Sequence, residues 1–341
     1  MGSKAKKSSN AVPAAFGWTF QSNAGIVIML KNLQRADAVR IEGDEDIEVH
    51  LSNGKKVYAQ AKGVMDPYDS SNAIAKLTNA LRTLSTVAMS PDMDSLIYVT
   101  NLANPFADDA TIRAFAGEIA DVPYERLPPQ CKDRITQICK AKGYKIPPRK
   151  FSVLTFDFSG EGENRYRIVK QLINELLSDL GLSEKGWGKR VLERWRDEFW
   201  ENASQPNRDV VITKKKMIWP IVVWESETRK SFLKIDGFDE DEIDDVLQRC
   251  RPIISDKEDN FQFAARVFGD FVQYQEENPS FKFREQVNGF IAAHWEEYKD
   301  EFEFPVADSR SRQVAVSVAL ERIIGNNEYM ESVKGKVNIC D

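Results

Sequence analysis

The stretch R-I-E-G-D-E-D-I-E-V-H-L-S-N-G-K-K-V-Y-A-Q-A-K, residues 40–62, decides the fold that we expect for this chain. Apolar and polar residues alternate in and just before it with the period of two that half-buried strands require. The alternation predicts three strands, at residues 39–42, 46–51 and 56–62. The links between them are short, at residues 43–45 and at the Asn53-Gly54 turn, and therefore favour an antiparallel meander.

The register of the second hairpin can be predicted by matching polar and apolar faces. A two-residue Asn53-Gly54 turn would set Asp46 opposite Ala61, which places a polar face against an apolar one. A slip of one residue moves every side chain to the other face, so the match requires another loop length. A three-residue loop with a bulge at Gly54 meets this requirement.

This loop leads us to predict a cluster of polar residues at one end of one sheet face. We expect Asp46 to lie opposite Lys62, and Glu48 opposite Gln60. The same reasoning across the first turn places Glu42 beside Asp46.

The elements around the meander complete an α/β arrangement. Apolar spacing predicts a helix over residues 19–33, with Gln21 at its start, and another over residues 74–88. The largely apolar segment 95–102 predicts a strand that is buried on both faces. The expected architecture is a mixed sheet of four strands with helices on both faces.

Beyond residue 104 the pattern becomes more helical. We expect helices at 111–119 and 130–141, a basic linker at 142–150, a strand at 151–158 and mainly helices from 238 to 324. The expected organisation is a flexible tail (1–14), an α/β domain (15–145), a mixed α/β connecting module (146–224) and an acidic helical interaction domain (225–341).

Charge is unevenly distributed along the chain. The net charge is −6, but residues 225–341 alone hold 15 basic against 26 acidic residues. The remaining part is basic and can approach nucleic acid, with Lys214, Lys215 and Lys216 as candidate phosphate contacts. The alternative is that the acidic end is an ordinary solvated surface and that the lysines serve solubility.

Composition also excludes several classes of protein. Two histidines and four scattered cysteines disfavour His-rich metal sites, zinc sites and disulfide frameworks, and fit a reduced cytoplasmic interior. The sequence contains no apolar run near the roughly 20 residues that a membrane-spanning helix needs.

The predicted cluster suits the hydrolysis of phosphodiesters. Asp46 would bind Mg²⁺, or Mn²⁺ in its place, and the Gln60 side-chain carbonyl and Ala61 backbone carbonyl would complete the protein's ligands. Lys62 would sit beside the scissile phosphate, where it orients the attacking water or offsets charge in the transition state. Glu42 is a candidate second carboxylate.

A purely structural interpretation stays open for the same residues. Asp46 and Lys62 can form an exposed cross-strand ion pair, which is worth less than ~1 kcal/mol. Asp44 and Glu45 lie in the turn, and we expect them to be less well placed for a metal.

The whole N-terminal arrangement resembles a known nuclease family. The residues that carry the resemblance are F-Q at 20–21, A-D-A-V-R-I-E-G-D-E-D-I-E at 36–48 and Y-A-Q-A-K at 58–62. They resemble the endonuclease module of the CD-NTase-associated double-strand DNA nucleases, in the restriction-endonuclease-like PD-(D/E)xK superfamily, Gln-x-Lys variant. The resemblance covers roughly residues 15–105. It implies Asp46, Gln60 and Lys62 as catalytic residues, with Gln21 and Glu42 in support.

The C-terminal part departs from that family. Segments 195–203 and 212–220 resemble the region after the nuclease module in these proteins, but the roughly 120 residues after Trp224 are few for a cyclic-oligonucleotide sensor. In similar defence systems the nuclease pairs with a HerA-type hexameric ATPase. We therefore expect an oligomeric Mg²⁺-dependent nuclease that cleaves double-stranded DNA in anti-phage defence and is activated by assembly or by such a partner.

Two other functions stay open. The first is a related nuclease whose cyclic-oligonucleotide sensor lies outside this chain, which would then be one part of a longer protein. The second is a non-catalytic DNA-binding or scaffold subunit of a defence complex.

Overall fold

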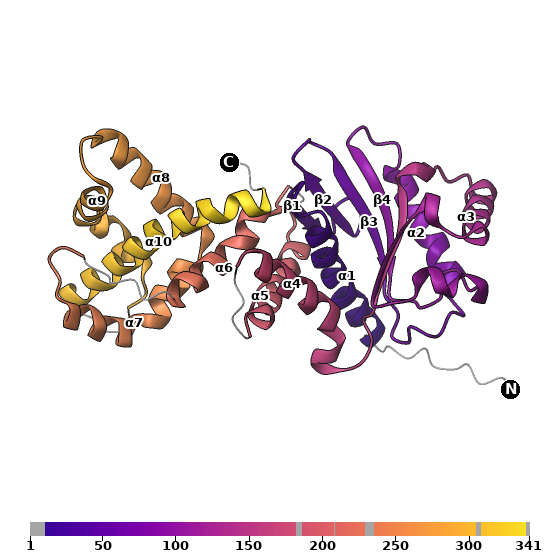
Figure 1. Ribbon diagram of the computed structural model, residues 1–341, viewed down its shortest axis with the longest axis horizontal. Coiled ribbons are helices and arrows are strands. Elements are labelled where there is room, and N and C mark those ends of the chain that lie inside the picture. Colours follow the sequence, from indigo (N-terminus) through magenta and orange to yellow (C-terminus); the bar gives the residue numbers. More distant parts are fainter. Residues whose placement is uncertain (1–10, 182–185, 208, 229–234, 305–307, 339–341) are drawn as a thin grey trace. The chain divides into compact units, whose positions relative to one another are not determined.

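The computed structural model describes residues 11–181, 186–207, 209–228, 235–304 and 308–338 (Figure 1). The chain divides into two compact units, residues 1–214 with 338–341, and residues 215–337. The predicted tail lies outside the described residues up to residue 10. From Val12 onward the chain is already helical, because Pro13 suits the first turn of a helix.

The first unit is built on a mixed sheet, so the predicted α/β class is confirmed. The described strands lie in the order β5-β6-β4-β3-β2-β1-β7, with β3, β4 and β6 parallel to one another and the other neighbours antiparallel. Their bounds are β1 (Ala36–Ile41), β2 (Ile47–Leu51), β3 (Lys56–Lys62), β4 (Met93–Thr100), β5 (Ile119–Pro123), β6 (Phe151–Phe156) and β7 (Ile212–Thr213). The sheet is wider than the four strands that we predicted.

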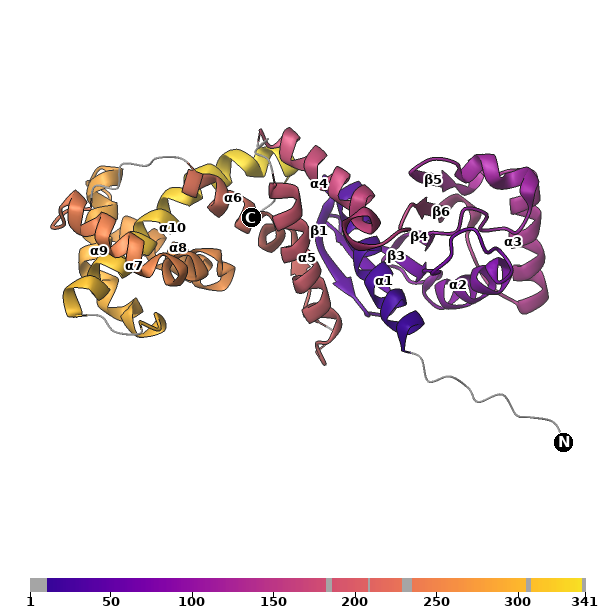
Figure 2. The same cartoon turned by 90° about the horizontal axis from the view of Figure 1, so that it is seen from below.

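Helices cover both faces of this sheet (Figure 2). Those of the first unit are α1 (Val12–Lys31), α2 (Ala73–Val87), α3 (Pro129–Lys142), α4 (Arg167–Asp179) and α5 (Trp187–Ala203). On one face, α2 and α3 pack on alternate strand residues such as Tyr58 and Tyr98. On the other face, α1 lies so close to β1 and α5 that a Cβ at Gly25 would meet side chains of both, at 2.7 Å from Ile41 Cδ1 and 2.9 Å from Phe199 Cε1.

Residues 104–214 differ from prediction in detail. The segment expected to be helical at 111–119 is a 3₁₀ helix (Asp109–Phe115) followed by the edge strand β5. The predicted strand at 151–158 is β6, which pairs with β4. Because β6 belongs to the same sheet, the structure does not separate residues 146–214 from the preceding domain, and the units divide after Lys214.

The β2–β3 hairpin has matched faces, as predicted, but a different register. Val49 pairs with Val57, and Glu48 with Tyr58 rather than Gln60. The predicted pairing of Glu48 with Gln60, and of Asp46 with Lys62, is therefore wrong by two residues.

The position of the loop explains the shift in register, because the observed loop begins one residue earlier than the predicted one. It holds three residues, 52–54, and closes with the Leu51 N–H donating to the Lys55 carbonyl at 2.8 Å. Gly54 has the left-handed φ of 75° that such a loop needs. Extending this pairing to the other end of the hairpin sets Asp46 across from Gln60.

The second unit is helical in its described residues, as predicted for 238–324. Its helices are α6 (Lys214–Thr228), α7 (Glu240–Asp259), α8 (Phe261–Glu277), α9 (Phe283–Tyr298) and α10 (Ser309–Val337). Aromatic side chains form much of its interior, including the edge-to-face pair of Phe271 and Phe290 at 5.4 Å. No helix in the described parts of the chain is both long enough and apolar enough to span a membrane.

The chain leaves and re-enters the first unit at one place. The Lys214 ammonium donates to the carbonyl of Leu33 at 2.9 Å and to that of Asn338 at 2.6 Å. The Asn338 side chain donates in turn to the carbonyl of Gln34 at 2.7 Å. The second unit is therefore inserted between two neighbouring points of the first.

Candidate active site

The three residues predicted to be catalytic meet where β3 ends. The Asp46 carboxylate precedes β2, and its Oδ2 accepts hydrogen bonds from the Gln60 side-chain amide and, at 3.0 Å, from the Ala61 N–H. Lys62 Nζ lies 3.7 Å from the same oxygen. The contacts form despite the shifted register because Lys62 becomes the diagonal neighbour of Asp46, within reach of its long side chain.

Gln21 and Glu42 support Asp46 from the first hairpin. Glu42 lies beside Asp46, as predicted, and its N–H donates to the Asp46 carbonyl at 3.0 Å. The Gln21 amide donates to Glu42 Oε1 at 2.7 Å and to the Asp46 carbonyl at 2.9 Å. Gln21 lies in the middle of α1 and is buried, rather than at the helix start as predicted, because the helix begins earlier.

Glu42 has an unusual backbone conformation. Its φ of 59° lies in the left-handed region, which is costly for a residue with a side chain. The backbone bond to Asp46 and the side-chain bond from Gln21 hold it there. Such strain is typical of functional sites, where the surrounding structure fixes a side chain in a set position.

Glu45, in the turn between β1 and β2, is an acidic residue that the structure buries. It is only 5% exposed, and Thr86 of α2 donates to its Oε1 at 3.5 Å. Its Oε2 is buried and has no hydrogen-bond partner among the described residues. Burial, and then the charge of Asp46, raise the pKa of Glu45 to about 7. Glu45 is therefore buried although it lies in the turn, and its placement for a metal, which we expected to be poorer than that of Asp46, stays a prediction.

Asp46 is also harder to ionise than an ordinary aspartate. Burial raises its pKa to about 6, and the charge of Glu42 adds to the rise. Lys62 and the Ala61 N–H act in the opposite direction. The site thus concentrates negative charge that its own cations do not fully offset.

The ligands expected for a metal are near one another but not arranged around a common point. Among the described residues, no group of three or more His, Cys, Asp or Glu side chains could hold a metal ion. The Gln60 amide donates to Asp46, whereas its carbonyl oxygen accepts from Thr83 of α2. Half a turn about the Gln60 Cγ–Cδ bond would bring that oxygen toward Asp46. The Ala61 carbonyl lies on the same side of β3 as its N–H, and so faces Asp46.

A buried carboxylate fixes the turn that carries the acids. Glu48 accepts from the Asp44 N–H, and its carboxylate fills the space that a Cβ at Gly43 would need. Burial alone would raise the pKa of Glu48, but the nearby His50 ring at 3.6 Å, the bond from the Asp44 N–H and the charge of Lys56 lower it to about 2. Glu48 is therefore ionised at neutral pH and holds residues 43–46 in place.

A second lysine stands near Lys62. Lys76 of α2 donates to the Gly63 carbonyl at 3.5 Å. Burial lowers the pKa of Lys76, and the positive charge of Lys62 lowers it further. Its distance from the motif along the chain hid it from sequence reasoning, because it reaches the site through the packing of α2 on β3.

Parallel strand β4 holds the chain just after Lys62. Thr100 donates to the Lys62 carbonyl at 2.7 Å. The Asn101 side chain makes two bonds with the Val64 backbone, each at 2.8 Å. The end of β3 is thus fixed from the side opposite to Asp46.

The candidate lysine cluster at 214–216 is placed differently from our prediction. Lys214 is 2% exposed and its ammonium is bound to backbone carbonyls, so it is not available to a phosphate. Lys215 and Lys216 are half-buried and begin α6 instead of forming a loop. The prediction of a phosphate contact is therefore wrong for Lys214.

Known proteins show at most a distant likeness to this chain. No protein-family model matches it, and neither does any curated protein. Among solved structures it is similar to the Moraxella osloensis Cap4 SAVED/CARF-domain containing receptor, at 18% identity and a TM-score of 0.38. The similarity covers 75% of this chain and 61% of the receptor, less than two thirds of the latter's length. A likeness this weak identifies neither a family nor an activity.

Proposed function

We propose that this chain is a metal-dependent endonuclease that cleaves double-stranded DNA. The observation that carries the proposal is the single carboxylate of Asp46, which contacts Gln60, Ala61 and Lys62 at the end of β3. The order of elements, α1, β1–β3, α2 and β4, is the one that the resemblance to restriction-endonuclease-like modules implies.

The proposed cofactor is Mg²⁺, with Mn²⁺ able to replace it. Asp46, the rotated Gln60 carbonyl and the Ala61 carbonyl would hold it, and Glu45 would supply a further oxygen. Support comes from the buried Glu45 Oε2, which has no partner among the described residues, and from the raised pKa of Glu45 and Asp46. A bound cation would pair with that oxygen and would lower the pKa of each acid. Oxygen donors of this kind suit a hard divalent cation, which when bound supplies charge neutralisation at the phosphate.

The remaining polar residues would act on the substrate or hold the acids. Lys62 would approach the scissile phosphate and stabilise the charge that develops there, with Lys76 adding a second positive charge. Gln21 and Glu42 would position Asp46 by donating to its backbone carbonyl, Gln21 through its side-chain amide and Glu42 through its N–H.

The proposed setting is bacterial anti-phage defence, in a homo-oligomer activated by assembly or by a partner such as a HerA-type ATPase. This part of the proposal is supported by the family resemblance. The second unit, as a separate acidic and helical body, is the candidate assembly surface, because its surface would repel DNA.

Plasmid cleavage in Mg²⁺ tests the proposal directly. We expect wild type, with the candidate ATPase present, to cut supercoiled plasmid, and Lys62→Ala to lose at least about 100-fold of the rate because one transition-state charge contact is gone. Lys55→Ala is the matched control, since Lys55 is an exposed lysine in the same hairpin. It should cut like wild type.

The same assay separates the rival functions. If wild type and Lys62→Ala are equally inert with every partner, the enzyme proposal fails and a non-catalytic DNA-binding subunit is favoured. The ion pair of Lys62 with Asp46 is the observation that favours this rival. Cleavage that requires an added cyclic oligonucleotide and a sensor protein, rather than the ATPase, would instead favour the nuclease whose sensor lies outside this chain.

A further inference from the structure

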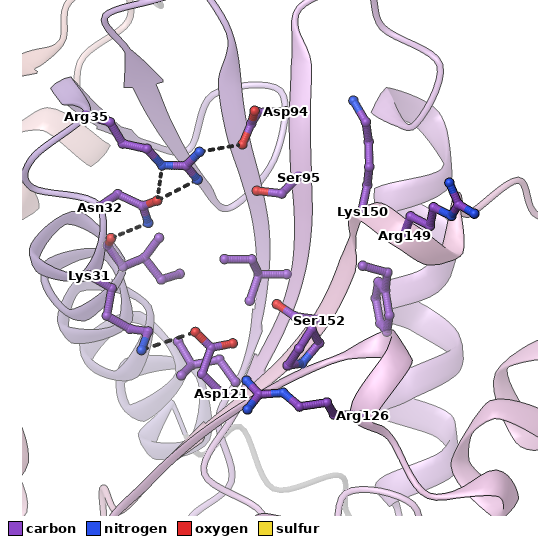
Figure 3. Close-up of a pocket in the computed structure, with 15 residues that line it drawn as sticks. Lys31, Asn32, Arg35, Asp94, Ser95, Asp121, Arg126, Arg149, Lys150 and Ser152 are labelled. Carbon is purple, nitrogen blue, oxygen red and sulfur yellow. Dashed lines mark hydrogen bonds and ion pairs between the residues drawn. The ribbon is translucent and has the colours of Figure 1, made fainter.

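A basic cavity lies in the first unit beside α1 and the strands β4 and β6 (Figure 3). The active-site residues follow the end of β3, whereas the cavity is lined by the starts of the parallel strands β4 and β6 and by the end of α1. Its volume is about 460 Å³, within the range of pockets for small ligands.

The lining of this cavity is strongly cationic. The basic residues around it are Lys31, Arg35, Arg126, Arg149 and Lys150, against two acids, Asp94 and Asp121. This excess of three positive charges occurs in a chain of net charge −6. A concave surface of one sign concentrates ions of the other sign, so the cavity favours anions.

Two of the arginines keep their charge uncompensated. Lys31 pairs with Asp121 and Arg35 with Asp94, both at 3.1 Å. Arg126 and Arg149 have no acidic partner among the residues that the structure describes. Both are exposed at the rim, where a guanidinium can bind two oxygens of one phosphate.

The floor of the cavity differs chemically from its rim. The sheet forms the floor, where the apolar Ile97 is 9% exposed, and the hydroxyls of Ser95 and Ser152 lie between the basic groups (Figure 3). A free phosphate would fill only a small part of a cavity of about 460 Å³. A duplex of DNA would not enter a cavity whose floor is the sheet.

We propose that this cavity binds a nucleotide. Its phosphate groups would contact Arg126 and Arg149, its base and sugar would occupy the remaining volume over Ile97, and the serine hydroxyls would donate to the sugar or phosphate oxygens. The proposal does not depend on cleavage, because the cavity and the candidate active site share no residue.

Calorimetric titration with ATP tests this proposal. EDTA in the buffer removes any binding that depends on a metal at Asp46. We expect wild type to bind ATP and the double variant Arg126→Gln/Arg149→Gln to bind it at least about tenfold more weakly, as expected when charge-assisted contacts to phosphate are lost. Inorganic phosphate should bind wild type more weakly than ATP does.

Arg82→Gln is the matched control, because Arg82 is an exposed arginine of α2 outside the cavity. It should bind ATP like wild type. The proposal is overturned if wild type does not bind ATP at millimolar concentration, or if Arg82→Gln loses as much affinity as the double variant. Equal unfolding temperatures of the three proteins without ATP would show that the exposed substitutions leave the fold intact.

Discussion

Where β3 ends, the carboxylates of Glu45 and Asp46 share a small buried space with one close cation, Lys62. Burial is the main reason why both acids are hard to ionise, and the charge of Asp46 adds to the effect at Glu45 as the charge of Glu42 does at Asp46. The two groups therefore hold protons in the folded state at a pH where the unfolded chain has released them. This property can be measured without any substrate.

The contribution of Glu45 and Asp46 to the stability of the protein should fall as the pH rises from about 4 to about 7. The folded pKa values are about 7 for Glu45 and about 6 for Asp46, above the ordinary 4.5 and 3.8, so the folded state binds more protons in this window. Glu45→Gln removes the cost of burying the charge. At pH 8 without divalent cations, we expect it to be more stable than wild type by about 1–3 kcal/mol, and at pH 4 to be equal. Urea unfolding at both pH values measures this, and an equal difference at both would contradict it.

Mg²⁺ should stabilise wild type at pH 8 if the acids hold it. A ligand that binds the folded state alone adds about 2.7 kcal/mol at 100 times its dissociation constant. Asp46→Asn should lose this stabilisation, whereas Asp37→Asn, an exposed aspartate on β1, should keep it. Thermal unfolding with and without Mg²⁺ measures the shift. The metal assignment fails if Asp46→Asn responds as wild type does.

Part of the site could be predicted from sequence at this scale and part could not. Asp46, Gln60 and Lys62 could be placed together because strand alternation fixes which side chains share a face. Glu45 could not, since it lies in a turn where alternation no longer tells the direction of a side chain. Lys76 depends on how α2 packs on the sheet, which no local pattern contains.

Among the elements, the turn between β1 and β2 depends on a charge that is buried beneath it. Glu48 holds the turn through the Asp44 N–H, and the turn carries the acids of the candidate site. Its folded pKa of about 2 lies below the ordinary 4.5, so its stabilisation is present above pH 4.5 and is lost as the pH falls toward 2.

Glu48→Gln should therefore destabilise the protein by about 1–3 kcal/mol at pH 7, and by much less near pH 2.5. The amide lacks the charge that strengthens the bonds from Asp44 and Lys56. Denaturant unfolding at the two pH values checks this, with Glu125→Gln, an exposed glutamate, as control. A loss that is independent of pH would mean that Glu48 acts through packing and not through charge.

Apolar periodicity in the sequence predicted some of the helices and strands and missed others. It identified α2, β4 and the meander because their apolar spacing is regular over five or more residues. It gave the parity of the hairpin register but not the register itself, because three-residue loops at 52–54 and at 53–55 keep the same faces together. The strand β7 has too few residues for any period to be read, and the edge strand β5, I-A-D-V-P, shows no alternation of apolar and polar residues.

At the scale of the molecule, the second unit is an insertion into the first. The chain departs at Lys214 and returns at Asn338, and the two are joined by the 2.6 Å bond from the lysine ammonium. Neither the predicted boundary at 224/225 nor the sequence pattern indicated this, since a return of the chain depends on contacts between distant residues.

Replacing residues 215–337 by a linker of about six Gly and Ser residues should leave the first unit folded. Such a linker spans up to about 20 Å, enough to join ends held together by Lys214. We expect a single cooperative unfolding transition and unchanged ATP binding at the basic cavity. The expected loss is that of self-assembly, measured by light scattering. An unfolded or aggregated product would show that the first unit requires the second.

The short strand β7 gives this insertion a mechanical property. It forms the outer edge of the sheet, pairs with β1 at Ala38 and Val39, and runs directly into Lys214. A force that pulls Lys214 away from the sheet would break the two pairs one after the other, first at Ala38 and then at Val39, instead of breaking both at once. The two pairs end at Val39, and the next contact along β1 toward Glu42 is the Asn202 side chain, whose oxygen accepts from the Ile41 N–H at 2.9 Å and would resist further opening. Tension applied from the inserted unit would thus reach the strained residue beside Asp46 through one strand.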